Sequence, residues 1–349
     1  MRLRLGLLTL LGGSLVWASA AHAQSTATLN AFGGVPPGLR ADQVAVVINL
    51  EDPSSVRIGE RYLKARGIPE GNLVRVRIPG SPRQLTAVEF EQLRREIEAQ
   101  VPSEAQALVL VWTTPYAVDC QSITAALTLG LEPGLCEHSC APSRPSPYFD
   151  SNSLRPHDDF GFRPAMLLPS QPEDLAQKLI QRGITSDRGT PRGDAFFLVT
   201  SDAARNSRAR FFPPSGRLGR PALAIHTLKT DHIENQRHIM FYETGAAWVT
   251  KLDTLRFLPG ALADHLTSVG GDLLGNGQMS ALRWLEAGAT ATYGTVSEPC
   301  NYWQKFPNSV VLLKHYLRGE TAIEAYWKSV AWPAQGLFVG EPLAAPYRR

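Results

Sequence analysis

Beyond its first two dozen residues, the sequence has no long apolar run, no run of basic residues and only four cysteines. No later segment approaches the roughly 20 consecutive apolar residues that a membrane-spanning helix requires, so no stable membrane span is expected. The formal net charge of +3 is spread along the chain, which argues against nucleic acid as a partner. No internal repeat or linker divides the sequence into smaller parts.

The first residues have the pattern of a Sec-type signal peptide. Arg2 and Arg4 precede an apolar run, and the small residues Ala21 and Ala23 precede a cleavage position. We therefore expect residues 1–23 to be a signal peptide that is cleaved after Ala23, and residues 24–42 to be an irregular leader. The remaining chain is expected to be periplasmic or secreted.

In such an oxidising compartment, the four cysteines are expected to form two disulfides, for which three pairings exist. We expect Cys300 to tie the preceding long loop to the core through Cys120, which leaves Cys136 to pair with Cys140. The Cys-x3-Cys spacing of the last two is also compatible with a zinc site, but oxidation favours disulfides. No metal or other cofactor is expected.

Apolar runs and helical periodicity alternate along the chain. Continuous apolar runs predict buried strands at residues 43–50, 107–112, 195–200, 238–242 and 289–293. An alternating pattern predicts an edge strand at residues 73–78. Helical patterns, several of them behind capping residues, occupy residues 54–67, 86–100, 173–182, 308–317 and 321–330. This alternation predicts an α/β fold with a mainly parallel sheet and helices on both faces.

Two stretches interrupt this alternation. Residues 114–170 are rich in proline and serine and hold three of the four cysteines, which predicts a functional or stapled loop. Residues 202–236 are polar, include Arg205, Arg208 and Arg210, and are interpreted as an excursion. We therefore expect one α/β domain over residues 43–349, with a long Cys-containing loop at 114–170.

Four short motifs in the second half of the chain resemble a known family. They are YETG, LPGA, LEAGATATYG and FVGEPL, at residues 242–245, 258–261, 285–294 and 338–343. Their order resembles the C-terminal half of the caspase-like, gingipain-type cysteine peptidases, over residues 195–345. A nearer likeness is to a family of exported bacterial proteins that keeps this architecture. The resemblance implies a three-layer α/β sandwich.

The resemblance also implies a catalytic Cys–His dyad on two consecutive strands, and this sequence departs from it. Where the family has Gly-His-Gly, this chain has Glu243, Thr244 and Gly245. Where the family has its nucleophilic cysteine, this chain has residues 259–261, Pro-Gly-Ala. Proteolysis by the family mechanism is therefore not expected.

The glycine-rich stretch from Leu258 to Pro307 holds the strongest catalytic candidates. Asp264 and His265 follow a strand predicted at residues 255–258, at the sheet end where open α/β folds place ligands. His265 would serve as a general base, although adjacent residues on an extended segment point in opposite directions. Alternatively, Asp264 caps a turn and His265 is a structural histidine with satisfied hydrogen bonds.

The other candidates surround this pair in the sequence. Glu298 follows the strand predicted at residues 289–293 and is a third catalytic candidate. Ser268 lacks the Gly-x-Ser-x-Gly turn of serine hydrolases and is interpreted as a binding residue. The full candidate binding set is Glu243, Thr244, Ser268, Gly270 and Gly271.

Two functions are compatible with these residues. The first is an exported protein of peptidase-like fold that has lost the dyad and binds a peptide or a cell-surface polymer in a cleft at the carboxyl edge of the sheet. The alternative is a hydrolase that uses His265 with Asp264 and a nucleophile that the sequence does not identify.

Overall fold

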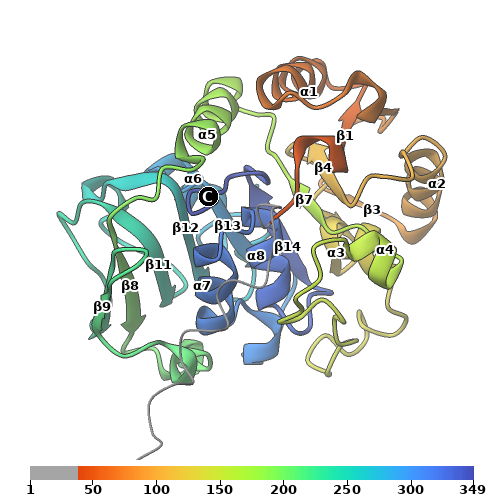
Figure 1. The fold of residues 1–349 in the computed structure, drawn as a ribbon. Helices are drawn as coiled ribbons and strands as arrows, with labels where there is room; N and C mark the ends of the chain where they lie inside the picture. The colour runs from red at the N-terminus through yellow and green to blue at the C-terminus, as the bar shows by residue number, and fades with distance from the viewer. Residues whose placement is uncertain (1–37) are drawn as a thin grey trace, which may run out of the picture. The chain divides into compact units, whose positions relative to one another are not determined.

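An eleven-stranded sheet runs through residues 38–349, which are the residues that the computed structural model describes (Figure 1). Its strands are β1 (Val44–Asn49), β2 (Leu73–Val76), β4 (Ala107–Val111), β7 (Ala165–Leu167), β8 (Gly193–Val199), β9 (Gly216–Leu218), β10 (Leu223–Lys229), β11 (Ile239–Gly245), β12 (Phe257–Leu266), β13 (Ala291–Thr295) and β14 (Gly336–Gly340). The short strands β3 (Gln84–Leu85), β5 (Ala117–Val118) and β6 (Gln121–Ser122) form a second sheet. The predicted signal peptide and most of the predicted leader lie outside the described residues.

The large sheet consists of two parallel halves that run in opposite directions. The order is β2-β1-β4-β7-β14-β13-β12-β11-β8-β10-β9, and only the pairs β13–β14 and β9–β10 are antiparallel. The predicted class, a mainly parallel α/β sheet, is confirmed. Because the halves meet at the antiparallel pair β13–β14, the carboxyl ends of β1 and β4 lie on the same sheet edge as the amino ends of β8, β11 and β12.

The two halves repeat one path of the chain, which the sequence does not reveal. In the first half, the chain forms β1, then β2 on the side of β1 towards the sheet edge, and then β4 on the side of β1 towards the centre of the sheet. In the second half, β8, β10 and β11 follow the same order. Each half therefore has a point where successive connections leave a strand in opposite directions, and ligand sites of open α/β sheets are found at such points.

Helices cover both faces of the sheet (Figure 1). They are α1 (Pro53–Arg66), α2 (Ala87–Glu98), α3 (Ile123–Leu129), α4 (Pro156–Phe160), α5 (Glu173–Ser186), α6 (Leu282–Ala287), α7 (Ser309–Leu317) and α8 (Ala322–Ser329). Helices α1, α5 and α6 pack in a row on one face, and α2, α3, α7 and α8 lie on the other. The side chains of β1 and β4 are buried throughout, as expected for strands that are covered on both faces.

Local signals in the sequence explain where several helices begin and end. Asp52 caps α1 by accepting from Ser54 N, and the helix ends at Gly67, which has a left-handed φ of +64°. Thr86 and Thr321 open α2 and α8 with capping boxes. The edge position predicted for residues 73–78 is confirmed, because β2 is the outermost strand of the first half.

Other boundaries differ from the sequence-based expectation. The predicted excursion at 202–236 contains β9 and β10, and the predicted loop at 114–170 contains β5, β6, α3, α4 and β7. Helix α5 was expected to end at residue 182 but continues to Ser186, because Gly183 packs against the buried side chain of Glu341 instead of ending the helix. No helix among residues 38–349 is long and apolar enough to cross a bilayer.

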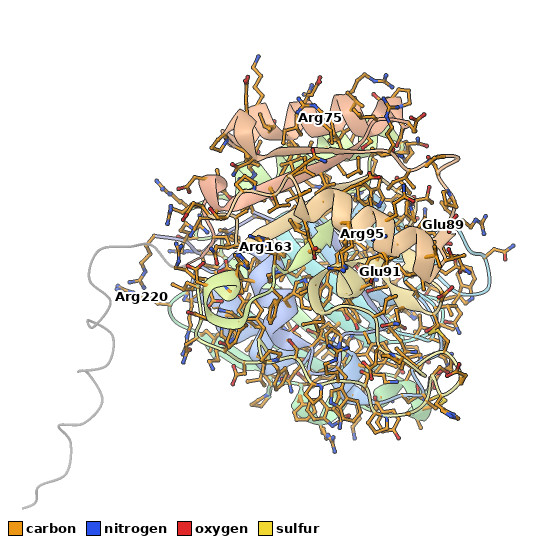
Figure 2. All side chains as sticks on the ribbon, turned by 90° about the vertical axis from the view of Figure 1, so that its right-hand side faces the viewer. Arg75, Glu89, Glu91, Arg95, Arg163 and Arg220 are labelled. Atoms are coloured by element: carbon orange, nitrogen blue, oxygen red, sulfur yellow. A yellow bond between two sulfur atoms is a disulfide. The ribbon has the colours of Figure 1, made fainter. Side chains whose placement is uncertain are left out.

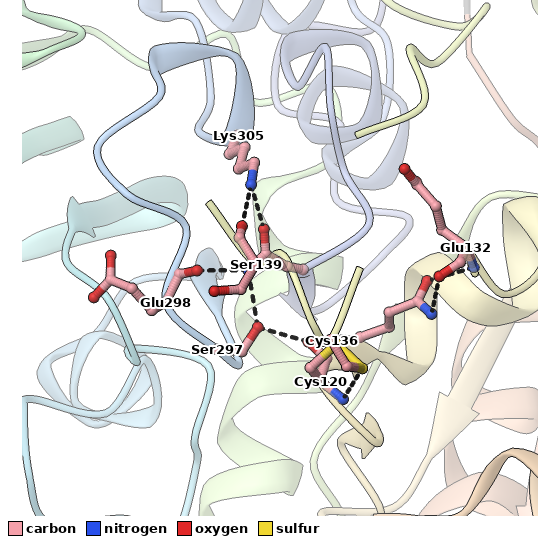
Figure 3. Close-up of a disulfide and its surroundings, with 9 residues drawn as sticks. Cys120, Glu132, Cys136, Ser139, Ser297, Glu298 and Lys305 are labelled. Atoms are coloured by element: carbon pink, nitrogen blue, oxygen red, sulfur yellow. Dashed lines mark hydrogen bonds between the residues drawn. A yellow bond between two sulfur atoms is a disulfide. The ribbon is translucent and has the colours of Figure 1, made fainter. Parts of the chain in front are cut away.

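The four cysteines form two disulfides, Cys140–Cys300 and Cys120–Cys136, the second of which is shown in Figure 3. The expected pairs Cys120–Cys300 and Cys136–Cys140 are therefore wrong, although Cys300 does tie the long loop to the core. The reason is that Cys136 lies beside the turn between β5 and β6, where Cys120 N donates to its sulfur. Two disulfides fit an oxidising compartment.

Side chains near the end of β13 hold this cross-linked loop in place (Figure 3). Ser297 Oγ donates to Cys120 O at 2.6 Å. Lys305 Nζ donates to Ser139 O at 2.6 Å and to Gln335 Oε1 at 2.7 Å. Burial lowers the pKa of Lys305 to about 8. The loop is thus fastened by hydrogen bonds as well as by disulfides.

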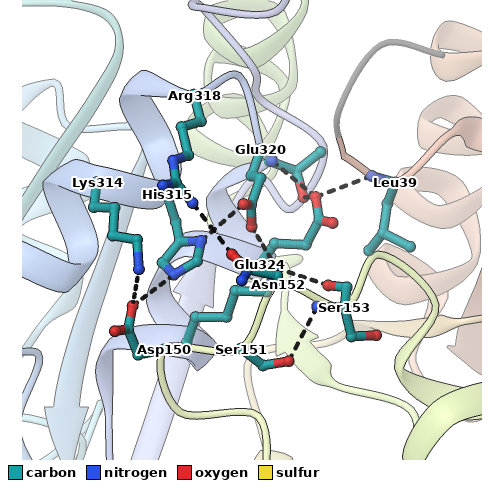
Figure 4. Close-up of polar contacts among 12 residues, drawn as sticks. Leu39, Asp150, Ser151, Asn152, Ser153, Lys314, His315, Arg318, Glu320 and Glu324 are labelled. Atoms are coloured by element: carbon teal, nitrogen blue, oxygen red, sulfur yellow. Dashed lines mark hydrogen bonds and ion pairs between the residues drawn. The ribbon is translucent and has the colours of Figure 1, made fainter. Parts of the chain in front are cut away.

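A polar network fastens the next part of the loop to α7 and α8 (Figure 4). The buried imidazole of His315 lies between two carboxylates, with Nδ1 2.7 Å from Glu320 Oε1 and Nε2 3.0 Å from Asp150 Oδ1. Lys314 Nζ is 2.7 Å from the same Asp150 oxygen, and Lys328 Nζ is 2.6 Å from Glu320 Oε2. The network is structural and satisfied.

Candidate functional site

A hollow of about 850 Å³ opens at the carboxyl ends of β1 and β4. It lies between the amino ends of α1 and α5 on one side and α6 with its preceding loop on the other. The lining residues are Asp52, Ser54, Ser81, Thr113, Thr114, Gln171, Pro172, Glu173, Leu273, Leu274, Ser280, Leu282, Arg283 and Glu286. Since β2 lies on one side of β1 and β4 on the other, the hollow occupies the ligand position expected for an open α/β sheet.

The hydrogen bonds of the chain itself hold the polar wall of this hollow. Asp52 Oδ1 accepts from Ser54 N at 2.9 Å, and Asp52 Oδ2 accepts from Ser170 Oγ at 3.1 Å. Thr113 Oγ1 accepts from Gln171 N at 3.0 Å. These bonds join the segment after β1 to the segments after β4 and β7, so the wall is arranged before any ligand arrives.

The opposite wall comes from the loop between β12 and α6. Tyr116 OH donates to Asp272 Oδ1 at 2.5 Å, which anchors the loop to the segment after β4. Gly271 packs directly against the backbone of Gly294, and a Cβ on Gly271 would lie only 2.6 Å from Gly294 O. Leu274 then projects into the hollow with 45% of its surface exposed. The close packing alone accounts for a glycine at position 271, so no ligand is needed to explain it.

The corresponding crevice of the second half, at the carboxyl ends of β8 and β11, is filled by the chain. The 3₁₀ turn Ala203–Asn206 packs there, and the backbone of Arg205 occupies the space that a Cβ on Gly245 would need. Thr200 Oγ1 donates to Gly245 O at 2.7 Å, and Asn206 Nδ2 donates to Thr200 O at 2.8 Å. Within residues 38–349, this turn therefore occupies the part of the crevice next to Gly245.

The segment predicted to replace the family's nucleophile lies elsewhere. Residues 259–261 form a bulge near the amino end of β12, between Phe257, which pairs with Ile239, and Leu262, which pairs with Phe241. The strand continues to Leu266, so Asp264 and His265 lie inside it. The loop predicted after residues 255–258 is therefore wrong. Proline and glycine made the strand look shorter in the sequence, but the bulge accommodates them.

Asp264 and Glu243 form a buried carboxylate pair on the face covered by α7 and α8. They are register partners on β12 and β11, and Arg208 reaches both, with Nη2 2.5 Å from Asp264 Oδ1 and Nη1 3.5 Å from Glu243 Oε2. Ser309 Oγ donates to Glu243. All of these charged side chains are at most 1% exposed.

Burial dominates the titration of this pair. It raises the pKa of Glu243 to about 8, against the opposing charge of Arg208 and with the support of Asp264. Burial also raises the pKa of Asp264, again opposed by Arg208. One arginine thus serves two carboxyls, and Glu243 holds a proton at neutral pH. With no access to solvent, the pair does not meet a substrate.

His265 points to the other face of β12 and is completely buried. Trp284 Nε1 donates to its Nδ1 at 2.9 Å, so Nε2 carries the proton and donates to Met279 O at 3.1 Å. Burial lowers the pKa of His265 to about 3. Asp264 points away from the ring, as expected for neighbours on a strand. In this arrangement His265 is a neutral structural histidine.

Replacement of His265 by glutamine is expected to flatten the acid side of the stability profile. The unfolded histidine gains its proton near pH 6.5, whereas the folded one gains it only near pH 3, so His265 alone contributes a loss of roughly 1.4 kcal/mol per pH unit on acidification between these values. Glutamine keeps one donor and one acceptor but does not titrate. Urea unfolding at pH 7.5, 6, 5 and 4.5 measures the difference. Parallel profiles for both proteins would contradict the structural role.

The remaining predicted residues do not gather into one site. Thr244 pairs with His265 in register but is fully buried. Ser268 contributes its carbonyl to a hydrogen bond from Thr295 Oγ1 at 2.9 Å, and Gly270 packs against the ring of His265. Glu298 is exposed, its Oε1 accepts from Cys300 N at 2.7 Å, and no hydrogen bond within residues 38–349 joins it to Asp264 or His265.

The residues of the hollow were not singled out from the sequence. The signal was present in the polar residues that directly follow two predicted buried strands, Asp52 after β1 and Thr113 with Thr114 after β4. Residues that follow neighbouring parallel strands meet at one edge, so their convergence was foreseeable. The contribution of α6 and its loop was not, because it depends on how the second half joins the first.

The hollow is lined by carboxylate, hydroxyl, amide and guanidinium groups together with apolar side chains. Among the described residues that line it there is no histidine, cysteine or lysine. Hydrogen bonds from Arg57 and Ser54 lower the pKa of Glu173, which therefore stays ionised instead of serving as an acid. Comparisons with models of protein families, with curated proteins and with solved structures returned no match. The site therefore has to be understood from its geometry.

Proposed function

We propose that this is an exported, non-catalytic protein of peptidase-like fold that binds a peptide or a cell-surface polymer in the hollow at the carboxyl ends of β1 and β4. The observation that carries this proposal is the prearranged polar wall around Asp52, Thr113 and Gln171, facing the exposed Leu274. Hydroxyl, amide and carboxylate groups next to an apolar side chain suit a ligand with alternating polar and apolar groups.

The strand order of the second half supports the peptidase-like part of the proposal. The strands that would carry the family's histidine and cysteine, β11 and β12, are adjacent and parallel. The loss of the dyad, together with the closed crevice beside Gly245, supports binding without cleavage. No observation favours the hydrolase alternative, because His265 is buried and both of its ring nitrogens already have partners.

Soluble sugar–peptide fragments of bacterial cell wall are the first probe, because they carry amides, hydroxyls and carboxylates on one chain. We expect Leu274→Ala to weaken their binding about fivefold to tenfold, since truncation removes apolar surface that the ligand covers. Isothermal titration calorimetry measures the affinity, and a panel of unstructured hexapeptides serves as the second probe.

Leu228→Ala is the matched control, because Leu228 is also an exposed leucine but lies on β10. Equal binding by the two variants would show that the ligand does not use the hollow. Release of cleaved fragments during the titration would overturn the non-catalytic assignment. Binding of neither probe would overturn the proposed binding function.

A further inference from the structure

A second surface, distinct from the hollow, lies at the amino ends of the strands of the second half. Two smaller hollows of about 340 and 350 Å³ meet there and share Arg192 and Ala222. Arg217 lines the first and Arg220 and Arg349 line the second, and all of these arginines are exposed. We call this surface the arginine edge.

The fold assembles the arginine edge from segments that are far apart in the sequence. Arg192 precedes β8, Arg217 lies on β9 and Arg220 follows it, and the pairing of Leu223 with both Gly193 and Leu218 brings these segments together. Arg237 and Arg256 lie beside the starts of β11 and β12, which are paired through Ile239 and Phe257. The even spread of charge in the sequence conceals this concentration.

The arginine edge has an excess of positive charge that the described chain does not neutralise. Arg192, Arg217, Arg220 and Arg349 form no ion pair with any residue from 38 to 349. The one acidic side chain that lines either hollow, Asp194, is already 2.8 Å from His226 Nε2. Other exposed arginines that lack ion pairs within the described chain, such as Arg61, Arg75 and Arg95, line neither of these two hollows, so it is the gathering of four such arginines around a concavity that sets the arginine edge apart. Unpaired guanidinium groups around a concavity are suited to oxyanions, which they bind in a bidentate manner.

We infer that the arginine edge binds a linear acidic polysaccharide through its carboxylate groups. Two adjoining hollows that share Arg192 suit consecutive anionic groups on one chain better than a single small anion. The disulfides place the protein in an oxidising compartment, where acidic glycans are available and nucleic acid is not the expected polyanion. Because the contacts are exposed charge pairs, affinity falls steeply with added salt.

The charge of the arginine edge is separated from acidic parts of the surface. Arg220 projects at one margin of the molecule in Figure 2, whereas Glu89 and Glu91 both lie on α2, away from it. Arg75 and Arg95 occupy that other region and are exposed. A polyanion therefore has a preferred side, and the region around α2 supplies control positions.

The test compares the purified full chain with Arg192→Ser/Arg217→Ser/Arg220→Ser, using polygalacturonate oligomers as the probe. We expect the triple variant to bind about tenfold more weakly at 50 mM NaCl, and its affinity to depend less on salt. Arg61→Ser/Arg75→Ser/Arg95→Ser removes the same charge from exposed arginines elsewhere and is expected to bind like the wild type. Thermal unfolding confirms that both variants fold.

Fully methyl-esterified oligomers, which keep the sugar chain without its carboxylates, are expected not to bind. Equal loss of binding affinity in both triple variants would overturn the inference, because binding would then depend on the net charge of the protein and not on the arginine edge. Stronger binding to anionic phospholipid vesicles or to duplex DNA than to polygalacturonate would also overturn it, because the partner would then be a membrane or a nucleic acid. The Leu274→Ala variant is expected to bind polygalacturonate normally, so this test is independent of the hollow.

Discussion

Replacement of Arg208 by methionine is expected to lower the free energy of unfolding by about 3–5 kcal/mol at neutral pH. The arginine lies between Asp264 and Glu243, and it is the only cation in ion-pair contact with either of them among the described residues. Its loss leaves buried carboxyls that must stay protonated or remain charged without compensation. Urea unfolding followed by circular dichroism measures the change.

Glu243→Gln is the informative control for this prediction. Because burial raises the pKa of Glu243 to about 8, glutamine resembles the protonated side chain, and its effect at pH 7 is expected to stay within about 1 kcal/mol. The contribution of Glu243 to stability should fall as the pH rises from about 4.5 to 8, because the unfolded glutamate ionises first; below about pH 6.5 the contribution of His265 changes in the opposite direction, so the slope is read between pH 6.5 and 8. Glu243→Gln should flatten this alkaline slope. An unchanged slope, or a mild effect of Arg208→Met, would contradict the shared-arginine description.

Loss of the disulfide Cys140–Cys300 is expected to cost more stability than loss of Cys120–Cys136. The first joins residues 160 positions apart and the second joins residues 16 apart. In the chain-entropy description these separations correspond to about 5 and about 3 kcal/mol. Paired Cys→Ser variants, compared by urea unfolding under non-reducing conditions, measure the difference.

The order of the two effects is the decisive outcome, because both variants lose the same chemical group. A larger loss for Cys120→Ser/Cys136→Ser would show that the local turn contributes more than the long-range tether. Peptide mapping of the unreduced wild type checks the pairs themselves. A peptide linking Cys120 to Cys300 would contradict the described pairing.

Much of the fold was predictable because its signals are local. The apolar runs at β1 and β4 and the capping boxes at α2 and α8 were found from residues that are close in sequence. Strand β10 was missed because His226, Thr227 and Lys229 interrupt its apolar pattern at the sheet edge. Strand β7 was missed because it has only three residues inside a proline-rich stretch.

The site was less predictable than the fold, because it depends on how distant segments meet. Asp264 and His265 attracted attention as adjacent polar residues, yet a strand sends them to opposite faces where other elements bury them. The hollow requires the loop between β12 and α6, which brings Leu274 next to the segments after β1 and β4. Neither the antiparallel junction at β13–β14 nor the disulfide pairing has a signature in residue spacing.

Hydrogen–deuterium exchange with saturating cell-wall sugar–peptide fragments tests the central claim most directly. We predict that bound ligand slows exchange in the segments that line the hollow, at residues 112–114, 171–175 and 273–283, and that Leu274→Ala weakens this protection. Protection confined to the carboxyl ends of β8, β11 and β12, around Thr200, Gly245 and Thr267, would contradict the account, because it would place the ligand in the crevice that the chain fills.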